Sequence, residues 1–124
     1  MGLDNGIEIR RTNDLPPCTS IFDNGYGIEV AYWRKCWNVR HIIYTIIDEP
    51  SDNDFEYELN LDQIHAIIKA LRTFNSKNYQ DYGGCIWEWD DFKRINRRNI
   101  HALKKLTKMM KQYPSIIPVF YDSY

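Results

Sequence analysis

The apolar residues of the chain recur with two different periods, one typical of helices and one typical of strands. Residues 61–75 place isoleucine, leucine and phenylalanine at i, i+3, i+4 and i+7, the spacing of an amphipathic helix. Residues 91–113 carry a second stripe of this kind, and Pro114 ends it because proline breaks a helix interior. Short polar side chains that accept hydrogen bonds from the first N–H groups favour a helix start at both places. The candidate caps are Asn60 or Asp62 for the first helix and Asp90 or Asp91 for the second.

Four shorter segments alternate apolar and polar residues, as a half-buried strand does. They lie near residues 7–11, 28–30, 55–59 and 117–121, the last as a strand or an extended arm. Asp4-Asn5-Gly6 predicts a turn before the first strand, and a short alternating run also covers residues 86–89.

The longest apolar run lies within residues 29–47 and predicts a central helix over about 32–47. A strand over residues 42–47 is the alternative, because four of those six residues are isoleucine. With this helix the chain has three main helices. The predicted fold class is α+β, with three main helices packed on a small, mostly antiparallel sheet in one domain over residues 1–124.

Arg40 falls inside the apolar arc of the central helix, among tryptophans and isoleucines. The guanidinium group of arginine stays charged in proteins because its pKa exceeds about 12. It therefore has to pair with a carboxylate, stack on an aromatic ring or reach water along its apolar stem. Two interpretations follow. Arg40 is a structural arginine paired with one of the chain's own acids, or it is a cation on the wall of an aromatic pocket for an anionic ligand.

Composition narrows the class of protein. Of the 124 residues, 44% are hydrophobic and 27% charged, as in ordinary globular domains, whereas the aromatic content of 15% is high. The net charge of −1 gives no general attraction to nucleic acid or membranes. Three cysteines, odd in number and far apart, predict reduced thiols rather than a disulfide framework. With no signal peptide and no apolar run of about 18 residues, the chain is expected to be cytoplasmic and not bound to a membrane.

The last helix carries the clearest electrostatic pattern. Eight of the sixteen Lys and Arg residues lie on its polar face, and no acid occurs from residue 93 to 113. Such a face binds the phosphate backbone of a nucleic acid, or is simply solvated, or is neutralised by the seven acids of residues 48–62 within the fold or across a homodimer. The candidate nucleic-acid contacts are Arg94, Arg97, Arg98, Lys104 and Lys105.

No complete catalytic, metal-binding or cofactor motif is present. The three histidines fall on three different predicted helices, without the spacing of a metal site or a hydrolytic triad. Gly83-Gly84 is not followed by a phosphate-binding pattern, and Cys36 is interpreted as a small buried hydrophobe. The sequence therefore predicts no metal and no cofactor, and does not decide whether the protein is an enzyme.

Short motifs at the two ends and the centre of the chain resemble those of a group of small hypothetical proteins from phages and prophages. The matching residues are Met1-Gly2-Leu3-Asp4, Glu29 with Tyr32-Trp33-Arg34-Lys35, and the aromatic tail Phe120-Tyr121-Asp122-Ser123-Tyr124. At positions 37 and 40 that group has Asn and His, where this chain has Trp37 and Arg40. The resemblance implies a phage or prophage origin and an α+β fold, and no activity.

The matching segments also suggest a site. If they converge in space, one place is lined by Asp4, Glu29, Trp33, Arg34 and Tyr121. The function predicted first is that of an accessory protein that binds a protein or nucleic-acid partner through aromatic and basic surface. The alternative is a small enzyme or ligand-binding protein with an aromatic, arginine-lined cleft that includes Arg40.

Overall fold

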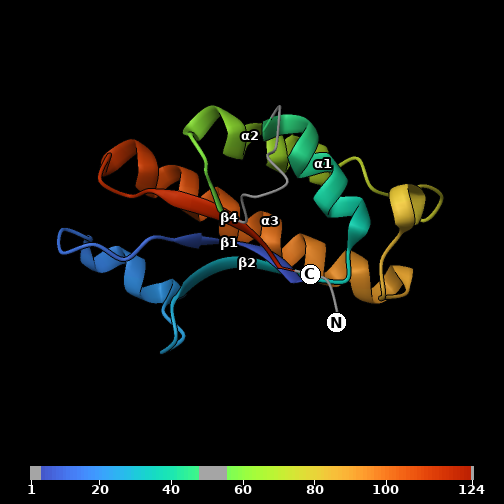
Figure 1. Cartoon of the computed structure of the whole chain (residues 1–124), viewed down its shortest axis with the longest axis horizontal. Coiled ribbons are helices and arrows are strands. Elements are labelled where there is room, and N and C mark those ends of the chain that lie inside the picture. The colour runs from blue at the N-terminus through green and yellow to red at the C-terminus, as the bar shows by residue number, and fades with distance from the viewer. Residues whose placement is uncertain (1–3, 48–55, 124) are drawn as a thin grey trace.

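Four strands and three α-helices make up the part of the chain that the computed structural model describes, residues 4–47 and 56–123 (Figure 1). The strands are β1 (Asp4–Ile9), β2 (Ile28–Arg34), β3 (Glu56–Glu58) and β4 (Pro118–Ser123). The helices are α1 (Trp37–Ile47), α2 (Leu61–Leu71) and α3 (Trp89–Gln112), with the 3-10 turns η1 (Pro17–Phe22) and η2 (Asp81–Gly83). The predicted α+β class is confirmed.

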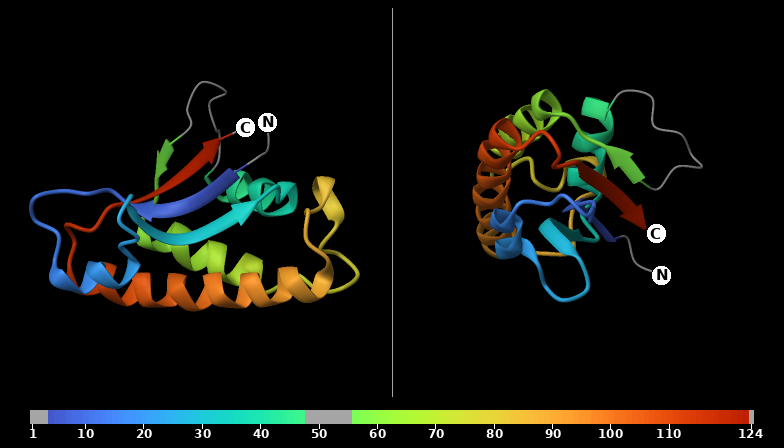
Figure 2. Two further views of the ribbon diagram at one scale, coloured as in Figure 1. Left: turned by 90° about the horizontal axis from the view of Figure 1, so that it is seen from below. Right: turned by 90° about the vertical axis from the view of Figure 1, so that its left-hand side faces the viewer.

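The strands form one antiparallel sheet in the order β2-β1-β4-β3, and the helices cover one of its faces (Figure 2). Alternation along β1 sends Ile7 and Ile9 toward the helices, and their cross-strand partners include Phe120 of β4 and Ile28 of β2. These residues are buried together with the apolar stripes of α2 and α3. Asp4, Gly6 and Glu8 alternate with them and belong to the outer face of the sheet.

The central helix begins five residues later than the sequence predicts, because residues 32–34 belong to β2. A register shift between Ile7 and Glu8 of β1 leaves one extra residue in β2. Ile28 and Trp33 therefore both face the core although their positions differ in parity, and the period of 2 is hidden in the sequence. Lys35, with φ of 50°, then turns the chain from strand to helix.

Several other boundaries also differ from the sequence prediction. Asn5 and Gly6, predicted in a turn, pair with both neighbouring strands within β1. The alternating run at residues 86–89 forms no strand, and Trp89 is the first residue of α3. Helix α2 ends at Leu71 rather than near residue 75. Of the strand predicted over 55–59, residues 56–58 form β3, and residue 55 lies outside the described ranges.

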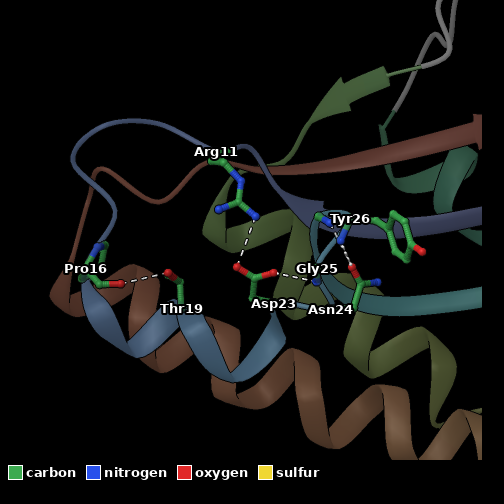
Figure 3. A network of polar contacts seen from close by, with 8 residues as sticks. Arg11, Pro16, Thr19, Asp23, Asn24, Gly25 and Tyr26 are labelled. Carbon is green, nitrogen blue, oxygen red and sulfur yellow. Dashed lines mark hydrogen bonds and ion pairs between the residues drawn. The ribbon is translucent and has the colours of Figure 1, made fainter.

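The connection from β1 to β2 is held by short polar contacts (Figure 3). In η1 the Thr19 hydroxyl donates to the carbonyl oxygen of Pro16 at 2.9 Å. Beyond it, the Asp23 carboxylate accepts from the Gly25 N–H at 2.9 Å and from Arg11 at 3.2 Å. Asn24 accepts from the N–H groups of Tyr26 and Gly27. These contacts close the loop from which β2 starts.

Helix starts agree with the predicted caps in one case only. Asn60 caps α2 through a reciprocal pair of hydrogen bonds with Gln63, and Asp62 lies in the first turn. The residue before α3 is Glu88, which makes no side-chain cap bond, while Asp90 and Asp91 lie in the first turn. Their charges still favour the positive end of the helix dipole.

We expect Asn60→Ala to lower the free energy of unfolding by about 1 kcal/mol, because it removes one half of the capping box of α2. Urea denaturation followed by circular dichroism measures this change. Asn60→Asp retains the accepting oxygen and should keep most of the stability. An equal loss in both variants would contradict the assigned cap.

Candidate functional site

The outer side of α3 is a continuous basic face. The apolar stripe of this 24-residue helix packs against the core together with buried Asn96, Asn99 and Thr107, and the basic side chains project into water. Every Lys and Arg of this helix is exposed, as is its histidine. We call these residues the basic face: Lys93, Arg94, Arg97, Arg98, His101, Lys104, Lys105, Lys108 and Lys111.

Very little of this positive charge is neutralised within the described ranges. The only ion pair that these cations form there joins Arg94 to Asp91 at 3.5 Å, one turn apart, with both side chains more than half exposed. Exposed pairs of this kind contribute at most about 1 kcal/mol and leave most of the field intact. Within the described ranges, the basic face therefore carries a positive field on its solvent side.

A groove between α2 and α3 adds an apolar floor to this charge. It has a volume of about 340 Å³, and four cations border it: Arg72, Lys93, Arg97 and Lys104. Its apolar lining is Leu71, Phe74, Trp89 and Ile100, with Asn96 between the two helices. The sequence pattern assigns Arg72, Phe74 and Trp89 to no site, because they lie outside the polar stripe of α3 and join it only through helix packing. Lys93 and Arg97 also line a second hollow that includes Arg94, Arg98 and His101.

Four of the five residues predicted to converge do share one surface, the outer face of the sheet. Asp4 and Arg34 are cross-strand partners, and the Tyr121 hydroxyl donates to Glu29 at 2.9 Å. Trp33 is the exception. It is fully buried on the opposite face, since successive side chains of a strand point to opposite sides. The predicted cleft around Trp33, Arg34 and Tyr121 is therefore not formed by these three side chains together.

Tyr121 reaches β2 from β4 by lying across the glycine of β1. A Cβ atom on Gly6 would lie 2.7 Å from the Tyr121 hydroxyl and 2.6 Å from the Ala31 carbonyl oxygen, so only glycine fits there. Burial, and then the hydrogen bond to Glu29, raise the pKa of Tyr121.

The second tyrosine of this face makes a similar contact. The Tyr32 hydroxyl donates to Asp4 at 2.7 Å. Burial, and then this hydrogen bond, raise the pKa of Tyr32 to about 12. Like Tyr121, it remains a protonated donor near neutral pH and does not act as a base.

Acids dominate the remainder of the outer face. A hollow of about 390 Å³ is lined by Glu8, Glu29, Glu56, Tyr121, Asp122 and Ser123. Burial raises the pKa of Glu8, and the nearby carboxylates of Glu56 and Glu29 raise it further, against the opposing effect of Arg10. Arg10 itself bonds to Glu58 at 3.0 Å and to Glu56 at 3.3 Å. This face repels anions, in contrast to α3.

Arg40 joins α1 to the last strand through a buried carboxylate. Its Nε donates to Asp122 Oδ2 at 2.8 Å, and the Tyr44 hydroxyl donates to the same oxygen. The guanidinium carbon also lies 4.3 Å from the centre of the Tyr44 ring and 5.7 Å from that of Trp37. Arg40 thus has both features considered from the sequence, a partner acid of the chain and a place between aromatic rings.

A shallow hollow of about 320 Å³ adjoins this contact, lined by Trp37, Arg40, His41, Tyr44, Thr45 and Tyr82. The His41 ring stacks on that of Tyr82, with centres 3.9 Å apart and planes 11° apart. This is the aromatic, arginine-lined surface that the alternative function requires, although it lies on α1 and η2 rather than beside Arg34 and Tyr121.

His41, His65 and His101 are exposed on three different helices. Within residues 4–47 and 56–123, no group of three or more His, Cys, Asp and Glu side chains is arranged to hold a metal ion. None of the helices in these ranges combines the length and apolar character that crossing a bilayer requires.

The chain matches no protein-family model, no curated protein and no solved structure. The resemblance to small phage and prophage proteins therefore stays a prediction, and the function has to be argued from the sites themselves.

We expect Glu8→Gln to stabilise the protein at about pH 7, because the folded state then no longer holds an ionised carboxylate that is partly buried and lies near Glu56 and Glu29. The folded pKa of Glu8 lies above the unfolded one. Its favourable contribution is therefore complete below the unfolded pKa and is lost as the pH rises through the folded pKa. The gain should vanish at about pH 3, where Glu8 is protonated in both states.

Urea titrations at both pH values, with Asp14→Asn as the exposed control, measure the difference. A gain of the same size at both pH values would show that the ionised carboxylate of Glu8 is not its cause.

Removing one partner of the Arg40–Asp122 pair should cost more than removing both. Arg40→Met leaves the fully buried Asp122 carboxylate without its cation and should lower the free energy of unfolding by about 3 kcal/mol. Arg40→Met with Asp122→Leu should recover most of that loss in denaturation experiments. Arg10→Met is the matched control, since its ion pairs are exposed and contribute at most about 1 kcal/mol. Equal losses for the two single variants would refute the role of burial.

Proposed function

We propose that the protein is an accessory binding module that holds nucleic acid against the basic face of α3 and the adjoining α2–α3 groove. The observation that carries this proposal is the exposure of eight Lys and Arg side chains on one helix, with one weak ion pair among them in the described ranges. The phage or prophage origin is proposed from the sequence resemblance alone.

Charge is separated across the molecule although its net charge is only −1. Helix α3 packs on the inner side of the sheet, whereas Glu8, Glu29, Glu56 and Glu58 belong to the outer side (Figure 2). A polyanion approaching the acidic side is repelled, and one approaching α3 is attracted, so the charge distribution orients the encounter. The net charge of the chain does not reveal this separation of charge.

The dimensions of the basic face also suit a nucleic acid. A helix of 24 residues is about 36 Å long, close to one turn of duplex DNA. Phosphate contacts from its cations would give affinity without sequence selection. The groove adds Trp89 and Phe74, whose rings are of the kind on which unpaired bases stack.

A second candidate, binding of a small anionic ligand, is favoured by Arg40 between the rings of Trp37 and Tyr44 beside the α1 hollow. It ranks lower because Arg40 already holds Asp122, so a ligand competes with a buried carboxylate for the same cation.

Nucleic-acid binding should be saturable and strongly dependent on salt. If about six cations contact phosphates, affinity should fall on the order of 10³-fold between about 50 and 200 mM salt. Fluorescence anisotropy of a labelled DNA duplex and of a labelled single strand measures this, and a labelled polyglutamate tests an acidic protein as the partner.

Charge-reversal variants test whether the basic face is the surface that binds nucleic acid. Arg97→Glu with Lys104→Glu should lower the affinity at least about 100-fold at low salt and reduce the salt slope by about two. The control is Arg34→Glu with Lys77→Glu, which changes the net charge equally at exposed residues that line neither the groove nor the second hollow. Equal loss in both double variants, no binding at either salt concentration, or tighter binding of polyglutamate would refute the proposal.

A further inference from the structure

Two cysteines far apart in sequence lie side by side where β2 passes into α1. Cys36 and Cys85 form an isolated antiparallel bridge, with their sulfur atoms 2.7 Å apart. Hydrogen bonds flank the pair, from Ile86 N–H to Lys35 O at 3.2 Å and from Asn38 N–H to Gly84 O at 3.1 Å. In this position of an antiparallel pair the side chains approach most closely, and Cα atoms about 4.5 Å apart fall within the range that a disulfide spans.

The two thiols differ in environment. Cys36 is fully buried, and Cys85 is only partly buried. Hydrogen bonding to Cys85, together with burial, raises the pKa of the Cys36 thiol. The same hydrogen bond, received from Cys36, lowers the pKa of Cys85, helped by the N–H groups of Trp87 and Ile86 and opposed by burial. A partly exposed thiol of lowered pKa beside a buried thiol is the arrangement of a nucleophile and its resolving partner.

We propose that Cys36 and Cys85 are a redox-active dithiol site, oxidised by low-molecular-weight disulfides such as that of glutathione. The Cys85 thiolate attacks one sulfur of the disulfide and releases one thiolate, which leaves a mixed disulfide on Cys85. Cys36 loses its proton to water and attacks the Cys85 sulfur. The Cys36–Cys85 bond forms, and the second thiolate leaves. The protein loses two electrons and two protons, and the small disulfide is reduced to two thiols.

The bond would fasten the segment before α3 to the start of α1. This segment already contacts α1, since a Cβ atom on Gly83 would lie 3.0 Å from Trp37 Cβ, and Tyr82 stacks on His41. Cross-linking two residues 49 positions apart should raise the melting temperature by on the order of 10 °C, because the unfolded chain loses conformational freedom.

The test equilibrates the folded chain, carrying Cys18→Ser, in glutathione buffers from fully reduced to fully oxidised. Free thiols are then alkylated and counted by mass spectrometry. We expect two alkylatable thiols at the reducing end, none at the oxidising end, and a Cys36–Cys85 cross-linked peptide in the digest. Two free thiols at every ratio, or glutathione on both cysteines without a cross-link, would overturn the proposal.

Single variants assign the order of attack. Cys36→Ala should accumulate the glutathione adduct on Cys85, whereas Cys85→Ala should leave the buried Cys36 unmodified while the protein stays folded by circular dichroism. Faster modification of Cys36 than of Cys85 would overturn the assigned roles. The rise in melting temperature on oxidation should occur with the pair intact and be absent from both variants. Should either variant fail to fold, the thiol count of the intact pair still decides whether the disulfide forms.

Discussion

A buried negative charge determines how the helical layer meets the sheet. Asp122 is the only buried acid or base in the described ranges, and a carboxylate out of water requires a cation and hydrogen-bond donors. Arg40 and Tyr44 of α1 provide both, so α1 has to lie with this side against β4. Asn5, the cross-strand partner of both Asp122 and Trp33, lies beside this contact. The side chains of Asn5 and Trp33 place further buried polar atoms here that have no partner in the described ranges. Such groups are the usual hosts of buried water.

With α1 held in this way, the two faces of the molecule acquire opposite character. The apolar stripes of the helices cover the inner face of the sheet, and the cations of α3 lie on the opposite, outer side of that helix. The outer face has room for acids and two tyrosines, because Gly6 lets Tyr121 lie flat across β1. Although the net charge of the chain is −1, one side of the molecule attracts polyanions. The fold, rather than the composition, creates this separation of charge.

The sequence predicts those parts in which periodicity and burial agree. The stripes of α2 and α3, the cap at Asn60 and the antiparallel strands are of this kind. The predicted start of α1 was wrong because the bulge in β2 shifts the parity of its buried residues. The predicted turn at Asp4-Asn5-Gly6 was wrong because Gly6 lies within β1, where the absence of a side chain leaves room for the Tyr121 ring. The contribution of Arg72 to the groove, and the meeting of Cys36 with Cys85, depend on tertiary packing, on which a single sequence carries no local signal.

The segment between α2 and α3 connects the thiol pair to the residues of the basic groove. It bears Tyr82 against α1, Cys85 against Cys36 and, four residues later, Trp89 at the mouth of the groove. Trp89 is further held by Tyr79 and Phe92, with ring centres 5.3 Å and 6.2 Å away. Only four positions along the chain separate Cys85 from Trp89, which lines the groove. The sulfur pair and the basic groove are thus neighbours through one short segment, although their side chains offer unrelated chemistry.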